Sequence, residues 1–175
     1  MPPRKILHLD LDAFFCAVEE LRHPHLRGKA FAVGGRPEQR GVVASCSYAA
    51  RALGIHSAMP TSQALRLCPT LIIISPTREG YSSYSQQVME RLKNLAPLVE
   101  QISIDEAFVD ISDLPAHPSE TALKLQKQIF DELGLPCSVG VASNKLVAKI
   151  ATETGKKSAR KANNNGPTGY PFALT

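Results

Sequence analysis

Two adjacent carboxylates, Asp105 and Glu106, lie between two apolar runs of strand length, and this arrangement constrains the fold more than any other feature of the chain. The apolar residues around the pair are Val99, Ile102, Ile104, Phe108, Val109 and Ile111. Carboxylates next to a buried core cost free energy unless a cation compensates their charge. We therefore expect a hairpin with buried arms that carries the two acids at its tip.

A third carboxylate, Asp10, ends another apolar run at residues 6–10. Three acids delivered by two strands are the ligand set that a pair of divalent metal ions needs, and such ions lie about 3.5–4 Å apart in enzymes of phosphoryl transfer. The pattern predicts nucleotidyl transfer with magnesium. The simpler alternative is a solvated turn, because Asp-Glu is a common dipeptide, but the apolar neighbours favour the metal site.

The composition is that of a folded chain that can bind a polyanion. The 175 residues are 43% hydrophobic, enough for one domain with a small subdomain, and the formal net charge is +4. The four cysteines form no CxxC pair, which argues against zinc and for reduced thiols in a cytoplasmic protein. We find no secretory signal and no apolar run of membrane length, so no membrane partner is expected. The absence of tryptophan leaves little for stacking on single-stranded bases.

Helices and strands alternate irregularly along the chain, which together with the hairpin predicts an α+β fold. We expect an antiparallel sheet that is covered on one side by helices and interrupted by a small insertion at residues 14–76. Asp12 is expected to cap a helix at residues 13–21.

In the C-terminal part of the chain, the sequence pattern predicts a helix from Lys145 to about Thr154 and then a flexible basic loop at residues 155–171. Residues 170–175 look like a strand that is cut short. We therefore expect the chain to be a fragment of a longer protein.

Three segments occur in an order that is specific to one family. They are His-Leu-Asp-Leu-Asp-Ala-Phe-Phe at residues 8–15, Ala-Ser-Cys-Ser-Tyr-Ala-Ala-Arg at residues 44–51 and Ser-Ile-Asp-Glu at residues 103–106. Together they resemble the Y-family (translesion) DNA polymerases, and most nearly the bacterial DNA polymerase IV (DinB-type) branch. The resemblance covers about residues 5–155.

The resemblance implies an N-terminal palm-plus-fingers fragment, the UmuC-type catalytic domain, at residues 5–175. The palm would be an antiparallel, ferredoxin-like sheet formed by residues 1–13 and 77–175, incomplete at its C-terminus, with its last strand truncated. The fingers would be a small α/β insertion at residues 14–76. The thumb and the C-terminal DNA-gripping domain of the family would be absent.

The resemblance also implies the metal site. Asp10, Asp105 and Glu106 match the catalytic metal-binding carboxylates, and the backbone carbonyl of Leu11 is expected as a further ligand. Oxygen ligands of this kind suit Mg²⁺, with two ions per site. For His8 we expect packing or a supporting hydrogen bond rather than proton transfer.

The remaining site residues bind the nucleotide and the DNA by analogy with the family. Phe15 matches the steric gate, whose ring leaves no room for a 2′-hydroxyl group, and the backbone N–H groups of Phe14 and Phe15 would face the triphosphate at a helix start. Further nucleotide-binding positions are Ser45, Tyr48, Arg51 and Lys156. Expected DNA-binding positions are Lys145 and Lys149.

The function implied is that of an error-prone, DNA-directed DNA polymerase that adds dNTPs to a primer 3′-OH and bypasses DNA damage. The expected partners are primer-template DNA, dNTP and a sliding clamp that binds through a C-terminal region not present here, and the expected state is a cytoplasmic monomer. One alternative is an inert or severely weakened fragment that acts only as a DNA- or nucleotide-binding module. A nucleotide cyclase-type palm is a second alternative, although its Gly-Gly-Asp/Glu-Glu/Asp-Phe hairpin is missing.

Overall fold

The computed structural model describes residues 3–162 and 172–174. The chain forms two compact units, one from Met1–Asp12 with Ser82–Thr175 and the other from Ala13–Tyr81. From the sequence alone we expected these boundaries after residues 13 and 76. We call the two units the sheet unit and the inserted unit.

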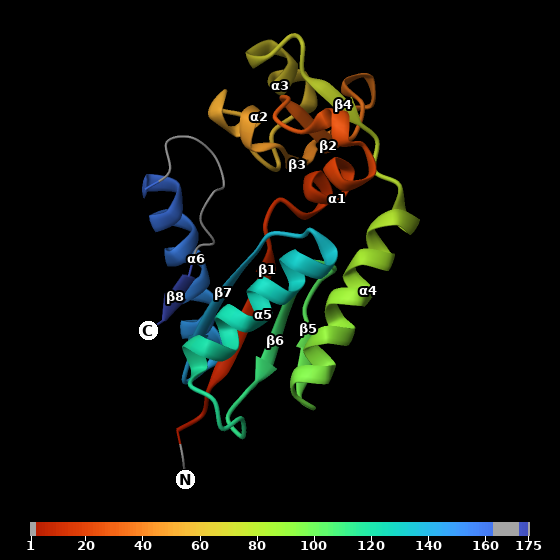
Figure 1. The fold of residues 1–175 in the computed structure, drawn as a ribbon. Helices are drawn as coiled ribbons and strands as arrows, with labels where there is room; N and C mark the ends of the chain where they lie inside the picture. The colour runs from red at the N-terminus through yellow and green to blue at the C-terminus, as the bar shows by residue number, and fades with distance from the viewer. Residues whose placement is uncertain (1–2, 163–171, 175) are drawn as a thin grey trace. The chain divides into compact units, whose positions relative to one another are not determined.

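A five-stranded sheet organises the sheet unit (Figure 1). Its central strand β1 (Ile6–Leu11) pairs antiparallel with β6 (Glu106–Asp110) on one side and with β7 (Cys137–Ala142) on the other. β5 (Val99–Gln101) lies antiparallel beside β6, and β8 (Phe172–Leu174) lies beside β7. β1 is buried along most of its length, as its four apolar residues allow, and it also includes His8 and Asp10.

Two helices connect these strands in the β-α-β-β-α-β order of ferredoxin-like folds. α4 (Arg78–Leu95) precedes the β5–β6 hairpin and crosses the boundary between the two units, and α5 (Pro118–Leu133) links β6 to β7. α5 starts with a proline and ends at Gly134, whose φ of 69° suits a helix C-terminus. The predicted α+β class, with an antiparallel sheet and helices, is confirmed.

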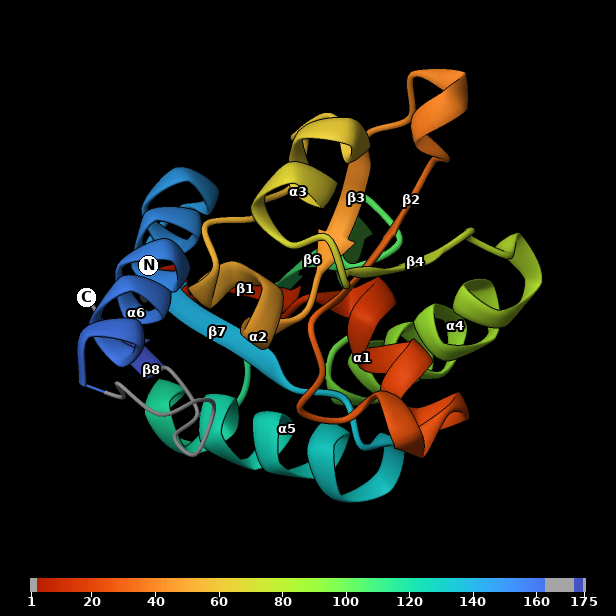
Figure 2. The same cartoon turned by 90° about the horizontal axis from the view of Figure 1, so that it is seen from above.

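Two details of the predicted sheet are wrong. β8 pairs with β7 in parallel, so the sheet is mixed at this edge. The helices also cover both faces rather than one, because α6 (Lys145–Ala162) and α5 lie on opposite sides of β7 (Figure 2). The sequence pattern shows that a helix is amphipathic but does not say to which face of a sheet it returns.

α6 is longer than the sequence pattern suggested. It continues through Gly155 and the basic residues after it to Ala162, where a loop was expected. A single glycine costs a helix about 1 kcal/mol, and the Lys, Arg and Ala residues that follow are strong helix formers. The rest of the expected loop, residues 163–171, lies outside the described residues.

A glycine in β7 sets how closely α6 approaches the sheet. A methyl group added at Gly140 would lie 2.6 Å from the main-chain nitrogen of Thr152 and 2.7 Å from its hydroxyl oxygen, and closer still to the carbonyl oxygen of Ala148. These distances are shorter than van der Waals contact, so only glycine allows this separation of helix and strand. Gly140 is also the register partner of His8 in β1.

The inserted unit has its own small sheet. β2 (Phe31–Gly34) lies between β3 (Val43–Cys46), to which it is antiparallel, and β4 (Ile72–Ile74), to which it is parallel. The helical segments of this unit are α1 (Phe14–Arg22), α2 (Tyr48–Ala52), α3 (Thr61–Leu67) and the short 3-10 turns η1 (Pro24–Leu26) and η2 (Pro37–Gln39). Its core consists of Ala32, Val43, Cys46, Ala50, Ile55, Met59, Ala64, Cys68 and Leu71. In the described part of the chain, every helix is too short or too polar to cross a membrane.

Replacement of Gly140 by alanine should destabilise the sheet unit. The added methyl group must push α6 away from β7, and overpacking of this kind costs about 1–3 kcal/mol. Urea unfolding of the variant should therefore show a lower free energy of unfolding. Thr154→Ala on the exposed side of α6 is the matched control and should change that free energy by less than about 0.5 kcal/mol. An unchanged Gly140→Ala midpoint would mean that α6 does not lie as close to β7 as described.

Candidate active site

The three predicted carboxylates come together at one end of the sheet unit. Asp10 near the end of β1 is the register partner of Glu106 at the start of β6. The main-chain N–H of Leu11 donates to the carbonyl oxygen of Asp105 at 2.9 Å, which ties the hairpin turn to β1. Strand pairing thus brings together acids that are almost a hundred residues apart in the sequence.

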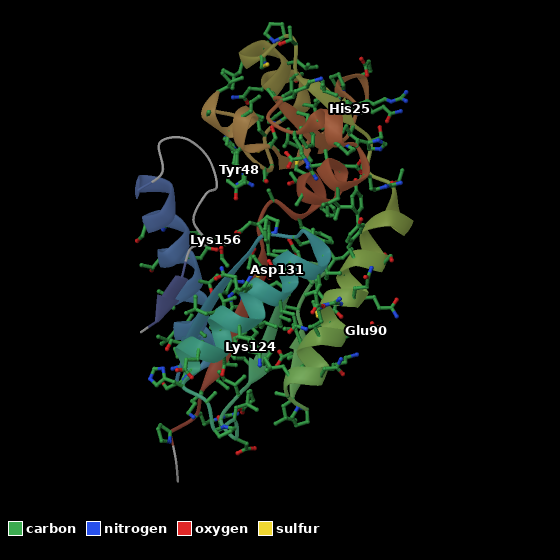
Figure 3. All side chains as sticks on the ribbon, viewed as in Figure 1. His25, Tyr48, Glu90, Lys124, Asp131 and Lys156 are labelled. Carbon is green, nitrogen blue, oxygen red and sulfur yellow. The ribbon has the colours of Figure 1, made fainter. Side chains whose placement is uncertain are left out.

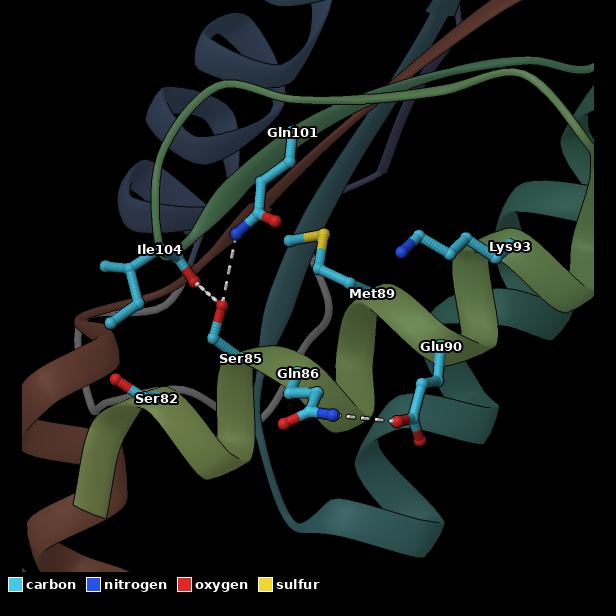
Figure 4. Close-up of a pocket in the computed structure, with 8 residues that line it drawn as sticks. All are labelled: Ser82, Ser85, Gln86, Met89, Glu90, Lys93, Gln101 and Ile104. Carbon is cyan, nitrogen blue, oxygen red and sulfur yellow. Dashed lines mark hydrogen bonds between the residues drawn. The ribbon is translucent and has the colours of Figure 1, made fainter. Parts of the chain in front are cut away.

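Side chains of α4 and β5 bind the backbone of the turn that carries Asp105 (Figure 4). The buried hydroxyl of Ser85 donates to the carbonyl oxygen of Ile104 at 2.5 Å, and the amide of Gln101 donates to the carbonyl oxygen of Ser103 at 3.0 Å. The Ser103 hydroxyl in turn donates to Oδ1 of Asp105 at 2.6 Å. Both the backbone and the carboxylate of the turn therefore have defined partners.

Lys156 neutralises the acids at the end of β1. Its Nζ lies 2.6 Å from Oδ1 of Asp10 and 3.4 Å from Oδ1 of Asp12, and its side chain is only 12% exposed. Figure 3 labels this lysine on α6. We expected Lys156 to bind the nucleotide, whereas in this structure its ammonium group pairs with the two carboxylates.

Asp12 belongs to this cluster and does not cap α1, which corrects the sequence-based expectation. The N-cap of α1 is Ala13, in a left-handed conformation and without a side-chain hydrogen bond. Both carboxylate oxygens of Asp12 instead accept from the hydroxyl of Ser138 at 2.9 Å. The signal that could have placed Asp12 here is its position two residues after Asp10, since residues i and i+2 of an extended segment share a face.

Glu106 is held by partners from β1 and α6. Its Oε1 lies 2.8 Å from Nε2 of His8 and 2.5 Å from Nζ of Lys149. The other ring nitrogen of His8, Nδ1, lies 2.8 Å from the hydroxyl of Thr152. The supporting hydrogen bond that we expected for His8 therefore goes to a predicted catalytic carboxylate.

Burial and neighbouring charges move the pKa values of these groups in different directions. Burial raises the pKa of Glu106, but the hydrogen bonds from Lys149 and His8 outweigh it and leave the pKa lowered. Burial lowers the pKa of His8, and the bond to Glu106 only partly opposes that effect. Glu106 is therefore ionised and His8 neutral near pH 7.

Asp10 behaves differently from Glu106. Burial raises its pKa to about 6, although Lys156 opposes the shift, and the charges of Asp12 and Asp105 add to it. For Lys156, burial lowers the pKa, but the charges of Asp10 and Asp12 outweigh burial and raise it. The two shifts have different causes: burial raises the pKa of Asp10, whereas the charges of the neighbouring carboxylates raise that of Lys156.

The donor atoms of this site suit a hard divalent cation. Asp10, Asp105, Glu106 and the carbonyl group of Leu11 offer only oxygen, as Mg²⁺ prefers. Within residues 3–162 and 172–174, no group of three or more His, Cys, Asp or Glu side chains is placed to hold a metal ion. Asp10 and Glu106 pair with lysines instead, whereas Asp105 accepts from Ser103, so cation binding requires at least Asp10 to exchange its lysine partner.

Two of the predicted nucleotide-binding residues, both aromatic, lie at the start of the inserted unit. Phe14 and Phe15 are the first residues of α1. The ring of Phe15 contacts that of Tyr81 edge-on at a centroid distance of 4.6 Å and lies 5.7 Å from the ring of Phe14. Phe15 is partly exposed, whereas Phe14 is buried.

The other predicted nucleotide-binding residues of the inserted unit lie on β3 and α2. The guanidinium group of Arg51 lies over the ring of Tyr48, 5.3 Å from its centroid, and donates to the carbonyl oxygen of Cys46 at 3.2 Å. Ser45 is buried in β3. The hydroxyl group of Ser47 caps α2, which fixes the start of the helix that carries Tyr48 and Arg51.

The two predicted DNA-binding lysines both form ion pairs within the sheet unit. Lys149 pairs with Glu106, while Lys145 pairs with Glu100 and lies over the ring of Phe108. Both lysine side chains are about half exposed. Pairs of this exposure contribute little to stability, so the lysines can exchange their partners at low cost.

Comparisons with known proteins agree with the resemblance in the sequence. The model of the impB/mucB/samB family matches residues 9–153. DNA polymerase IV of Ralstonia nicotianae is 44% identical over 156 residues, and DNA polymerase IV of Clostridium perfringens is 47% identical over the same length. Each match covers 87% of this chain but only 44% of the relative, so the chain spans less than half the length of these curated relatives.

Solved structures give the same result for the fold. DinB from Sulfolobus solfataricus matches with a TM-score of 0.84 and 28% identity, over 98% of this chain and 48% of that protein. An insertion ternary complex of Dbh DNA polymerase matches with the same TM-score, identity and coverage.

The raised pKa of Asp10 should make it a pH-dependent source of instability. Its pKa in the folded chain is about 6 against 3.8 ordinarily, so its favourable contribution is present below about pH 4 and is lost as the pH rises through 6. Asp10→Asn cannot ionise, so its free energy of unfolding relative to the native chain should rise by about 2 kcal/mol between pH 4 and pH 7. Urea unfolding in EDTA measures this, with Asp131→Asn on α5 as the control. A difference that stays constant with pH would contradict the raised pKa.

Proposed function

Because this chain belongs to the impB/mucB/samB family and to the Y-family DNA polymerases, we propose that it carries the catalytic machinery of a DNA-directed DNA polymerase of the translesion type. The reaction is attack of the primer 3′-OH on the α-phosphorus of a dNTP opposite a template base, which adds the nucleoside monophosphate to the primer and releases pyrophosphate. The chain spans 44% of the length of the curated relatives named above, so we propose the activity, substrates and partners for the chain itself.

One observation supports the chemistry most directly. Asp10 and Glu106 are cross-strand partners, and the Asp105 carbonyl is bonded to the N–H of Leu11, so three carboxylates reach the same end of one sheet. DNA polymerases depend on divalent metal ions, and Mg²⁺ prefers ligands that are all oxygen atoms. We propose two Mg²⁺ ions held by Asp10, Asp105, Glu106 and the carbonyl group of Leu11.

When bound, such ions activate the attacking hydroxyl group and neutralise charge on the leaving pyrophosphate. The chain's own residues do the positioning. The bonds from Ser103 and Ser85 keep the turn with Asp105 in place, and those from His8 and Lys149 orient Glu106. Lys156, released from Asp10, is a cation suited to a phosphate oxygen of the nucleotide.

In the inserted unit, we propose that Ser45, Tyr48 and Arg51 bind the triphosphate of the dNTP. Arg51 offers several N–H donors, and its placement over the Tyr48 ring limits its freedom. Phe14 and Phe15 offer backbone N–H groups at the start of α1. The partly exposed ring of Phe15 is proposed as the steric gate against a 2′-hydroxyl group.

Primer-template DNA is the second substrate, with Lys145 and Lys149 as proposed contacts to its phosphates. A sliding-clamp partner, a monomeric state and a cytoplasmic location remain part of the proposal, on the strength of the family. A cyclase-type palm receives no support from the family and fold matches. The remaining alternative is a module that binds DNA or nucleotide without catalysis, and experiment has to distinguish it from an active polymerase.

Primer extension by this chain should depend on Asp105. At low salt with Mg²⁺ and a single dNTP, we expect extension by the native chain and at least an about 100-fold loss in Asp105→Ala, because bound metals supply several kcal/mol and 1.36 kcal/mol is tenfold in rate. Asp131→Ala, on the exposed side of α5, is the control. Extension that survives in Asp105→Ala would refute the mechanism, and no extension by the native chain would favour the binding module.

Selection against ribonucleotides should depend on Phe15. Phe15→Val removes most of the ring, so the ratio of rNTP to dNTP incorporation should rise by at least about 10-fold while dNTP incorporation persists. Phe130→Val on α5 is the matched control. An unchanged ratio in Phe15→Val would show that this ring is not the gate.

A further inference from the structure

Only one oxygen of the Glu106 carboxylate is occupied by the protein. His8 and Lys149 both bond to Oε1. Oε2 has no hydrogen-bond partner among residues 3–162 and 172–174. A carboxylate fixed through one oxygen presents the other in a constant direction, which is what an external cation requires of a ligand.

His8 is rigidly placed next to Oε1 of Glu106. Its side chain is fully buried, and its ring lies against Phe108, with 4.7 Å between ring centroids. An ionised carboxylate can only accept hydrogen bonds, so the bond to Oε1 requires a hydrogen on Nε2. The sheet fixes the distance, because His8 and Phe108 are register partners on β1 and β6.

Thr152 on α6 contacts the other ring nitrogen of His8, Nδ1. Its hydroxyl lies 2.8 Å from Nδ1 of His8, closer than the 3.1 Å to the carbonyl oxygen of Ala148 and the 3.4 Å to the carbonyl oxygen of His8. A hydroxyl that donates to Nδ1 leaves the ring hydrogen on Nε2, where Glu106 accepts it. Gly140 makes this contact possible, since any side chain there would push Thr152 away.

We propose that Thr152 and His8 are positioning residues that form a relay from α6 through β1 to Glu106 and leave Oε2 of Glu106 open to a divalent cation. The hydroxyl of Thr152 donates to Nδ1 of His8, and Nε2–H of His8 donates to Oε1. The meaning of this relay for catalysis rests on the proposed function, but the relay itself does not.

Metal binding provides the first test, with Mn²⁺ as the probe and this chain as the protein. Loss of a hydrogen bond behind a metal ligand typically weakens metal binding 10- to 100-fold. We expect Thr152→Val to raise the Kd for Mn²⁺ at least about 10-fold and Thr152→Ser, which keeps the hydroxyl, to restore most of the affinity. Thr154→Val, an exposed threonine on the same helix, is the matched control. Equal Kd values for Thr152→Val and the native chain would overturn the proposal.

The ring of His8 provides a second test that needs neither metal nor substrate. Nitrogen-15 NMR of the imidazole in the native, metal-free chain should show a proton on Nε2 and a hydrogen-bonded, unprotonated Nδ1. A ring protonated on Nδ1 alone would overturn the relay, because Nε2 would then have no hydrogen to give to Glu106. This test also holds if Thr152→Val fails to fold.

The two tests separate the relay from the proposed function. If the native chain binds no Mn²⁺ and extends no primer, the proposed function fails, and the NMR spectrum alone supports or overturns the relay. If primer extension is measurable, Thr152→Val should lower kcat with little change in the KM for dNTP, and Thr152→Ser should recover kcat. A change confined to KM would overturn the positioning role.

Discussion

Carboxylates crowded at one end of a buried strand need positive charge beside them, and the rest of the sheet unit is arranged to supply it. Asp10 and Asp12 share the ammonium group of Lys156, and Glu106 has that of Lys149. Both lysines come from α6, and α6 lies close enough to the acids only because β7 has Gly140 where a side chain would collide with the helix. A glycine in β7 thereby allows positive charge to lie beside the carboxylates of β1 and β6.

The two units of the chain contain different groups of proposed site residues. The sheet unit contains the acids and their lysines, whereas the inserted unit contains the aromatic and arginine side chains proposed for the nucleotide. The chain passes from Asp12 directly to Ala13, so the last acid and the first ring are near neighbours in sequence although they belong to different units. A short motif at residues 8–15 therefore serves both units, which explains its value for recognising the family.

The sequence predicted the acids and the class of fold, because apolar runs of strand length and a paired carboxylate are local signals. It did not predict the partners of those acids. The bond between His8 and Thr152 joins residues 144 positions apart, and the site of Lys156 depends on a helix whose end was placed too early at Thr154. The mistaken cap at Asp12 has the same origin, since the hydroxyl of Ser138 that binds it is 126 residues away. Contacts of this range follow from the topology of the sheet and not from local propensity.

The contacts of α6 have a mechanical consequence. Lys149, Thr152 and Lys156 follow one another at spacings of three and four residues, so they project from one face of a single helix. The backbone of one helix thus positions the partners of Asp10, Glu106 and His8, so a displacement of α6 weakens all three contacts at once. A lysine side chain can still leave its carboxylate while the helix stays in place, because its four-carbon stem is flexible. The carboxylates can therefore exchange their cations without losing the helix that orients them.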